Sequence, residues 1–456
     1  MKGLKILTDN KEFYPKLLKI AIPTIVQFLI SNLLNFLDIF MIGQLGTADV
    51  AAVGIVSQIV FVSFLLMFGI GSGAAVLTAQ YWGKKDIAKI RSILGFALLL
   101  TSIVSIIFAT CALLIPKELI ALFTKDTNVQ DIGKGYLQLI GISQLFSGLA
   151  YPFFFVLNST ENVKTSMFAT IIALLFDTLI SYCLIFGLFF FPKLGVIGTG
   201  IGTLCGRMIQ FGIMISASYL LKLPTAGKFT EFFSFSKVLL KQYLIRSSPV
   251  ILQNFFWGFG TIMISWVYAR ISTESITAVT IAASVESICL LFLSGIGISA
   301  ATMIGNRIGA GEEEKAENYA KKFLIISYII SFIIMVILLL IRDYITIFFN
   351  ITPLSKSYVS KIIIVMAFLV WAKASNIMFY IGILKAGGDT HFCMTIDVGG
   401  TWLIAVPIAL ISGFVFHLPV FLIAAFIAID EFLRMIIGYN RFYSKKWIKN
   451  LTKEIK

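Results

Sequence analysis

Long apolar segments separated by short polar stretches run through this chain of 456 residues. Many segments, such as residues 323–341, carry apolar side chains on nearly every side. A helix of about twenty residues crosses the roughly 30 Å hydrocarbon core of a bilayer, whereas a membrane β-strand is shorter and alternates apolar with polar positions. The pattern therefore predicts membrane-spanning helices. The twelve predicted spans are residues 15–41, 50–80, 92–115, 133–157, 166–190, 195–221, 247–269, 276–306, 322–341, 360–384, 393–416 and 418–440.

The composition agrees with an all-α membrane protein. Hydrophobic residues make up 58% of the chain, charged residues 13%, and the mean hydropathy is +0.94. A soluble protein of this size would expose a largely apolar surface, so that class is excluded. The first fifteen residues are polar and the apolar segment after them is too long for a signal-peptide core, so we expect the first helix to be retained.

The formal net charge of +14 is a topology signal. With the start of the chain inside the cell, the inner segments between predicted spans hold 26 of the 37 Lys and Arg residues and the outer segments hold eight. Inner loops of membrane proteins carry such an excess of basic residues. We therefore expect a multi-pass protein of the cell membrane with both termini in the cytoplasm, in contact with anionic lipids and not with nucleic acid. The abundance of Ile and Lys favours a prokaryotic source.

An internal repeat divides the chain into two halves. When the chain is aligned with itself at one constant offset, Pro23 matches Pro249 and Gln27 matches Gln253. The later parts of the halves match at a slightly larger offset, which aligns Lys164 with His391. An even number of helices in each copy keeps both copies in the same orientation. We predict two pseudo-symmetric six-helix lobes around a central cavity. The predicted regions are an N-terminal lobe over 1–221, a cytoplasmic linker over 222–245, a C-terminal lobe over 246–440 and a basic cytoplasmic tail over 441–456.

The short loops leave no room for an ATP-hydrolysing domain, and the chain has no GxxxxGK[ST] phosphate loop. Uphill transport would therefore use an ion gradient. An intramembrane enzyme is disfavoured because paired histidines, a metal motif and a nucleophile elbow are missing, and a receptor because no sizeable extramembrane domain is present. The five cysteines lack CxxC spacing, so we expect no disulfide, no zinc site and no cofactor.

Polar residues line one face of the first predicted span. Gln27, Ser31, Asn35 and Asp38 follow one another at spacings of four, four and three, which places them on one side of a helix. An ionisable side chain in a span costs a few kcal/mol unless it is paired, hydrated or protonated. We interpret the face as a site for a sodium ion or a proton; a helix-packing network is the alternative. Ile264 stands at the position of Asp38 in the second half, so ion coupling is expected in the N-terminal lobe.

Several motifs resemble the multidrug and toxic compound extrusion (MATE) transporters. Pro23, residues 38–46 (DIFMIGQLG) and residues 79–83 (AQYWG) resemble the start of this family, and residues 382–390 (GILKAGGDT) and 397–402 (DVGGTW) resemble its second half. The resemblance implies a monomeric antiporter that exports small organic compounds, often cationic and amphipathic, in exchange for sodium ions or protons. A lipid-linked oligosaccharide flippase of the wider superfamily is the alternative, although flippases generally have two further helices and a cationic cavity.

The resemblance also assigns a role to Asp177. This residue matches the membrane aspartate of MATE members that couple through the first lobe, and we expect it to lie close to Asp38. Ala173 departs from the family pattern, because those members often have Asn four residues before the aspartate. The departure leaves the choice of ion open.

Charged and aromatic residues in the second half are candidates for a substrate cavity. Another branch of the family has acidic residues where this chain has Trp257 and Ala374, so that site is not carried over. Glu286 either binds a cation or forms a salt bridge with Lys373. Arg207 and Asp397 are interpreted as structural or gate residues, and Asp430 and Glu431 as local partners of Arg434. The cavity candidates are Glu286, Gln253, Trp257, Lys373, Tyr380 and Met378, with Trp371 and Met394 as further possibilities.

Overall fold

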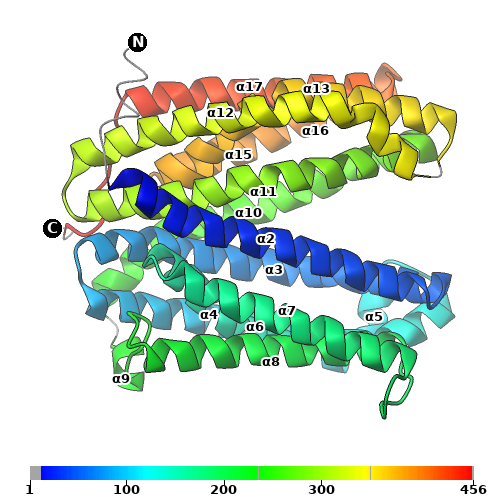
Figure 1. Ribbon diagram of the computed structural model, residues 1–456, viewed down its shortest axis with the longest axis horizontal. Helices are drawn as coiled ribbons and strands as arrows, with labels where there is room; N and C mark the ends of the chain where they lie inside the picture. The colour runs from blue at the N-terminus through cyan, green and yellow to red at the C-terminus, as the bar shows by residue number, and fades with distance from the viewer. Residues whose placement is uncertain (1–11, 235, 350, 454–456) are drawn as a thin grey trace. The chain divides into compact units, whose positions relative to one another are not determined.

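The computed structural model describes residues 12–453 except 235 and 350. The described part is helical and contains no strand, which confirms the predicted all-α class (Figure 1). The α-helices are α2 (Phe13–Gly43), α3 (Thr47–Gly83), α4 (Ile87–Leu114), α5 (Pro116–Ala121), α6 (Thr127–Ser159), α7 (Val163–Phe186), α8 (Val196–Leu220), α9 (Phe229–Phe232), α10 (Lys237–Ile271), α11 (Thr273–Gly309), α12 (Glu313–Ile345), α13 (Pro353–Ile377), α14 (Leu384–Ala386), α15 (Thr390–Gly399), α16 (Val406–Leu410) and α17 (Val420–Tyr443).

The described helices match the twelve predicted spans in order. Eleven helical stretches are long and apolar enough to cross a membrane, counted over the described residues. The last predicted span corresponds to α17, which is of similar length but carries Asp430, Glu431 and Arg434 near its middle. These three charges lower its hydropathy and are treated below as part of a polar centre.

Two predicted spans in the second half contain π-helical turns. In the tenth span η2 (Met378–Ile383) follows α13, and in the eleventh η3 (Gly400–Ala405) and η4 (Ile411–Val415) flank α16. A π-turn inserts an extra residue into a helix and often occurs at functional sites.

The chain packs into two compact units whose boundaries lie inside the first and seventh long helices. The N-terminal unit is Ile22–Ile251, and the C-terminal unit contains the described residues up to Ala21 together with those from Leu252. Both boundaries lie close to a helix proline, Pro23 in α2 and Pro249 in α10. Each unit thus includes the start of the long helix that opens the other repeat.

Specific contacts hold these helix starts in their units. In the N-terminal unit Tyr243 of α10 donates a hydrogen bond to the carbonyl oxygen of Ile70 (3.1 Å) and stacks on Phe96, with ring centroids 5.9 Å apart. In the C-terminal unit Phe13 of α2 makes an edge contact with Phe323, with centroids 5.1 Å apart. Phe323 is the counterpart of Phe96 at the offset that aligns the later parts of the halves, so a helix start packs on the same position of the repeat in both units.

Much of the predicted linker packs against the N-terminal unit. Helix α10 begins at Lys237, inside the predicted range 222–245. Arg91 of α4 pairs with Glu231 of α9 at 2.8 Å, and Gly95 leaves the space that the Phe232 carbonyl occupies. The lobe and linker boundaries stay predictions, but the segment is largely helical or docked.

Glycines allow α7 and α8 to pack closely in the N-terminal unit (Figure 1). Gly198, Gly202 and Gly206 recur every four residues on α8 and face Leu184, the Asp177–Ser181 turn and Asp177 on α7. Small residues at this spacing let helix backbones approach in membranes. The close approach brings the Asp177 side chain against α8.

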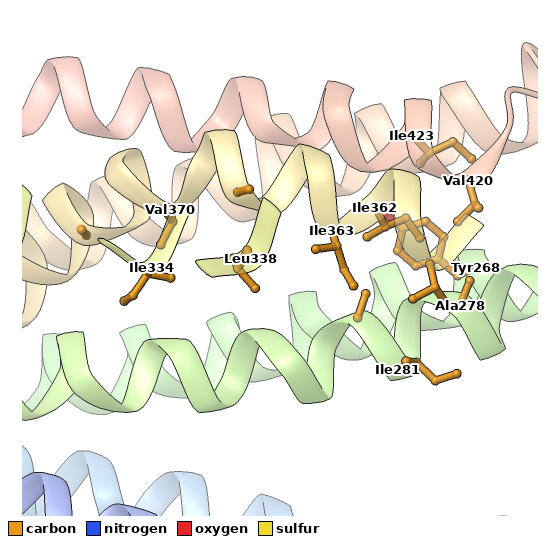
Figure 2. Packing of buried hydrophobic residues seen from close by; sticks show 14 of the residues in the cluster. Tyr268, Ala278, Ile281, Ile334, Leu338, Ile362, Ile363, Val370, Val420 and Ile423 are labelled. Carbon is orange, nitrogen blue, oxygen red and sulfur yellow. The ribbon is translucent and has the colours of Figure 1, made fainter. Parts of the chain in front are cut away.

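The C-terminal unit has a large apolar cluster built from α10, α11, α12, α13 and α17. Figure 2 shows part of it, with Ile362, Ile363 and Val370 of α13 among the labelled side chains. Its members are fully or almost fully buried. The cluster fixes α13 between its neighbours and so positions the polar residues that the same helices carry.

Residues after α17 fold back onto the C-terminal unit. Trp447 is fully buried, its indole N–H donates to the Phe442 carbonyl at 3.1 Å, and the Lys449 amide donates to the Gly387 carbonyl at 3.0 Å. Asp389, which is 2% exposed, is paired with Arg441 and Lys449. The described part of the predicted basic tail, residues 441–453, is therefore packed over these residues.

Candidate functional site

The N-terminal unit brings two membrane carboxylates together. Asp38 of α2 lies close enough to Asp177 of α7 to interact with it electrostatically. Asp177 is 8% exposed and accepts hydrogen bonds from the Ser181 hydroxyl (3.2 Å) and the Thr203 hydroxyl (3.4 Å). Its orientation is therefore fixed by one neighbour on its own helix and one on α8.

Asp38 is held less tightly than Asp177. Its Oδ1 atom is shielded from solvent and accepts no hydrogen bond, and the Thr178 hydroxyl nearby lies outside hydrogen-bonding geometry. Tyr136 of α6 is buried and interacts electrostatically with both carboxylates. A shielded carboxylate oxygen with no donor is able to accept a cation or a proton.

A chain of polar side chains links this pair to the start of the predicted stripe. The Gln27 amide donates to the Thr170 hydroxyl at 3.0 Å, the Gln210 amide donates to the same hydroxyl at 3.1 Å, and Arg207 donates to Gln210 at 3.0 Å. Arg207 also interacts electrostatically with Asp177. The centre thus contains two carboxylates and one arginine, which leaves one carboxylate without a basic partner.

The residues of the predicted polar stripe on α2 differ from one another in burial. Gln27 is buried within the network, Ser31 is half-buried, and Asn35 is exposed on α2. Sequence reasoning missed Thr170, Thr203 and Gln210 as members of the centre. A signal was present, because Thr203, Arg207 and Gln210 are spaced four and three apart on α8, the same periodicity that marked the stripe on α2.

In the C-terminal unit Glu286 of α11 forms a salt bridge with Lys373 of α13. The structure thus favours the salt-bridge interpretation of Glu286 over a free cation ligand. The predicted pairing within α17 is confirmed, since Arg434 contacts both Asp430 and Glu431, the latter at 3.4 Å. Arg434 also donates to Asp397 of α15 at 2.7 Å, and this contact ties α17 to α15.

The remaining cavity candidates differ in exposure. Gln253 of α10 is buried and donates to Asp397 Oδ2 at 2.5 Å, and Tyr380 is buried and donates to the Arg434 carbonyl at 2.8 Å. Met378 is fully buried, whereas Trp257 is 47% exposed. Their place in a substrate cavity stays a prediction. Among the described residues, no group of three or more His, Cys, Asp or Glu side chains is arranged to hold a metal ion.

Curated relatives match this chain over nearly their whole length. An uncharacterized transporter, YisQ, of Bacillus subtilis is 23% identical over 90% of both chains. A probable multidrug resistance protein, NorM, of Thermotoga maritima is 24% identical over 97% of this chain and 95% of its own. A probable multidrug resistance protein, YoeA, of Bacillus subtilis is 22% identical over 98% of both.

Solved structures share the fold. A transporter of the MOP superfamily from Pyrococcus furiosus, described as having a binding pocket of reverse polarity, matches with a TM-score of 0.84 at 17% identity, over 98% of this chain and 99% of that one. An outward-facing multidrug resistance MATE transporter matches with a TM-score of 0.83 at 17% identity over the same shares.

The family model named MatE matches two segments, residues 23–183 and 249–411. The two matches begin at Pro23 and Pro249, the positions that the internal repeat aligns. Together they cover most of the chain in the order that the repeat predicts. The chain therefore belongs to the MatE family, the multidrug and toxic compound extrusion transporters, whose members are transporters and not enzymes.

Proposed function

We propose that this protein is a secondary antiporter that exports organic, cationic and amphipathic compounds in exchange for sodium ions or protons. The observation that carries the proposal is the centre formed by Asp38, Asp177 and Arg207, which contains two carboxylates and only one basic group. An unbalanced carboxylate in an apolar environment costs a few kcal/mol or more. Binding a sodium ion or a proton removes that cost, so the centre favours occupancy by one positive charge.

The contacts of the centre support different roles for its two carboxylates. Asp177 is oriented by two hydroxyls and by the arginine, so it keeps its place when the cation leaves. Asp38 has a shielded oxygen without a donor and is the group whose interactions change most on binding. We infer that Asp38 takes up and releases the cation while Asp177 holds the site together.

Exchange follows if the two ligands favour different states of the transporter. A cation at the N-terminal centre stabilises one of the inward-open and outward-open states, and the organic substrate stabilises the other. The coupling free energy is reciprocal, so a cation moving down its gradient lowers the affinity for substrate on the side of release. Two relatives, NorM of Thermotoga maritima and YoeA of Bacillus subtilis, are named probable multidrug resistance proteins, which supports an organic cargo.

The proposed orientation has both termini in the cytoplasm. It rests on the basic residues, of which 26 fall in inner and eight in outer segments when the start of the chain lies inside. In this orientation Pro23 and Pro249 lie near the cytoplasmic ends of α2 and α10.

The test is efflux of a labelled organic cation from proteoliposomes under sodium and proton gradients imposed separately. We expect Asp38→Asn to abolish gradient-dependent efflux without preventing membrane insertion, because the amide cannot bind the positive charge. Asp131→Asn is the matched control, since Asp131 is exposed and paired with Lys117. Gradient-dependent efflux by Asp38→Asn at the wild-type rate would refute the mechanism.

A further inference from the structure

The close contact of α7 and α8 places Arg207 beside the carboxylate pair. A Cβ atom at Gly206, the residue before it, would lie 2.9 Å from Asp177 Cβ. Thr203 lies one helical turn before Arg207 and donates to Asp177 at 3.4 Å. Residues four apart share one face of a helix. Arg207 therefore projects from the face of α8 that covers Asp177, in agreement with its electrostatic interaction with that carboxylate.

A chain of hydrogen bonds holds the guanidinium group in place. Arg207 Nη1 donates to Gln210 Oε1 at 3.0 Å, and the Gln210 amide donates to the Thr170 hydroxyl at 3.1 Å. The Gln27 amide of α2 donates to the same hydroxyl at 3.0 Å. Gln210, Thr170 and Gln27 are all buried. The positive charge of Arg207 is thus tied to α7 and α2 through three buried side chains.

This charge is also permanent. A guanidinium group is not deprotonated in proteins, so Arg207 carries one positive charge in every state of the transporter. It faces the two carboxylates of Asp38 and Asp177, and without a further cation the centre has one unbalanced negative charge. Unbalanced charge in a membrane span is costly, whichever its sign.

The second half of the chain has an arginine at the equivalent place. Arg434 is the counterpart of Arg207 at the offset that aligns the later parts of the halves. It donates to Asp397 at 2.7 Å and also contacts Asp430 and Glu431, and so forms the polar centre of the C-terminal unit. Both units therefore keep a resident cation against membrane carboxylates at this position, which supports an electrostatic role for Arg207.

We propose that Arg207 sets the number of positive charges that the N-terminal centre takes up. By balancing one of the two carboxylates, it limits the centre to one sodium ion or one proton. Arg207 acts through Asp177 and is not itself a ligand of the cation. The inference rests on the proposed antiport and adds its charge stoichiometry.

Substitutions change the count in a way that simple charge balance predicts. Arg207→Gln leaves two carboxylates without a base and should take up two positive charges. Asp177→Asn leaves Asp38 and Arg207 to balance each other and should take up none. The double variant Asp177→Asn, Arg207→Gln leaves Asp38 without a base and should take up one again, as should Arg207→Lys. A merely structural role for Arg207 predicts no such recovery, because the double variant would then be at least as impaired as Asp177→Asn.

The measurement is equilibrium uptake by the purified full-length chain in lipid nanodiscs. One arm counts radioactive sodium bound at saturation, and the other counts protons taken up in a sodium-free difference titration. Each count is taken relative to Asp38→Asn, in which the centre is already balanced, so that charges bound elsewhere cancel. Arg342→Gln is the matched control, because this arginine lies at the end of α12 and pairs with the exposed Asp343. The control should count one charge, like the wild type.

A count of one for Arg207→Gln would overturn the role of Arg207, as would equal counts for Asp177→Asn with and without Arg207→Gln. The double variant decides the matter even if gel filtration shows that Arg207→Gln misfolds, because it removes both members of the pair. These results would leave the proposed antiport intact. The antiport proposal fails separately, through a wild type that takes up no charge or through gradient-dependent efflux by Asp38→Asn in proteoliposomes.

Discussion

Substituting Gly202 with alanine tests whether close packing of α7 and α8 positions the N-terminal centre. A Cβ atom at this position would lie 2.8 Å from the Asp177 carbonyl oxygen and 2.9 Å from the Ser181 amide nitrogen. Both atoms belong to the backbone of α7, so no side-chain rotation relieves the contact. An ordinary contact distance of about 3.4 Å requires the helices to separate by roughly 0.5 Å, and overpacking of this kind costs about 1–3 kcal/mol.

The separation also affects the site. Thr203, the next residue on α8, donates to Asp177 at 3.4 Å, which is already a long hydrogen bond. Moving α8 away breaks it and removes one of the groups that orient the carboxylate. We therefore expect Gly202→Ala to lower both the free energy of unfolding and the rate of gradient-dependent efflux.

The assay combines denaturant titration in mixed micelles with efflux from proteoliposomes. Gly212→Ala is the control, because it lies on the same helix and a Cβ atom there meets nothing within 4 Å. The control should match the wild type in both measurements. Equal stability and equal efflux for the two variants would show that the glycine contact does not set the geometry of the centre.

Three further substitutions test other parts of the molecule. Lys373→Met leaves the half-buried Glu286 without its partner and should cost about 1–3 kcal/mol, and adding Glu286→Gln should recover most of the loss in a double-mutant cycle. Trp447→Ala removes a fully buried ring and should cost about 3–5 kcal/mol by denaturant titration, unlike a change at an exposed site. Hydrogen bonds from Lys315 and Arg307 hold the pKa of Glu312 below its usual range. Glu312 therefore stabilises the fold above the ordinary glutamate pKa, and this stabilisation is lost as the pH falls through its folded-state pKa. The gap in unfolding temperature between wild type and Glu312→Gln should therefore close between pH 7 and about pH 3, and a gap that widens on acidification would contradict this assignment.

The order of the spans could be predicted because uniform apolar segments have few alternatives in a membrane. The ends of the helices could not. Helix α12 begins at Glu313, ahead of the predicted start at 322, and α10 begins at Lys237, within the predicted linker. Hydropathy locates the part of a helix that lies in lipid, but polar turns that continue the helix into water resemble a loop.

The candidate site was partly accessible from sequence for a similar reason. Asp38 and Asp177 stand out because charge is rare in a span, and the family resemblance paired them. Thr170 does not stand out, since a threonine in a span usually bonds to its own helix backbone. Its role as an acceptor for both Gln27 and Gln210 depends on tertiary packing. The apolar pattern of the second half likewise gives no sign of its π-turns.

The residues up to Ala21, just before Pro23 in α2, and the residues before Pro249 in α10 each belong to the compact unit formed by the other half of the chain. This affects which fragments of the chain contain a complete unit. A polypeptide that ended before α10 would lack residues 237–251, which complete the N-terminal unit. A lone second half would lack residues 12–21 in the same way. Each half of the repeat taken alone therefore lacks residues that belong to its compact unit.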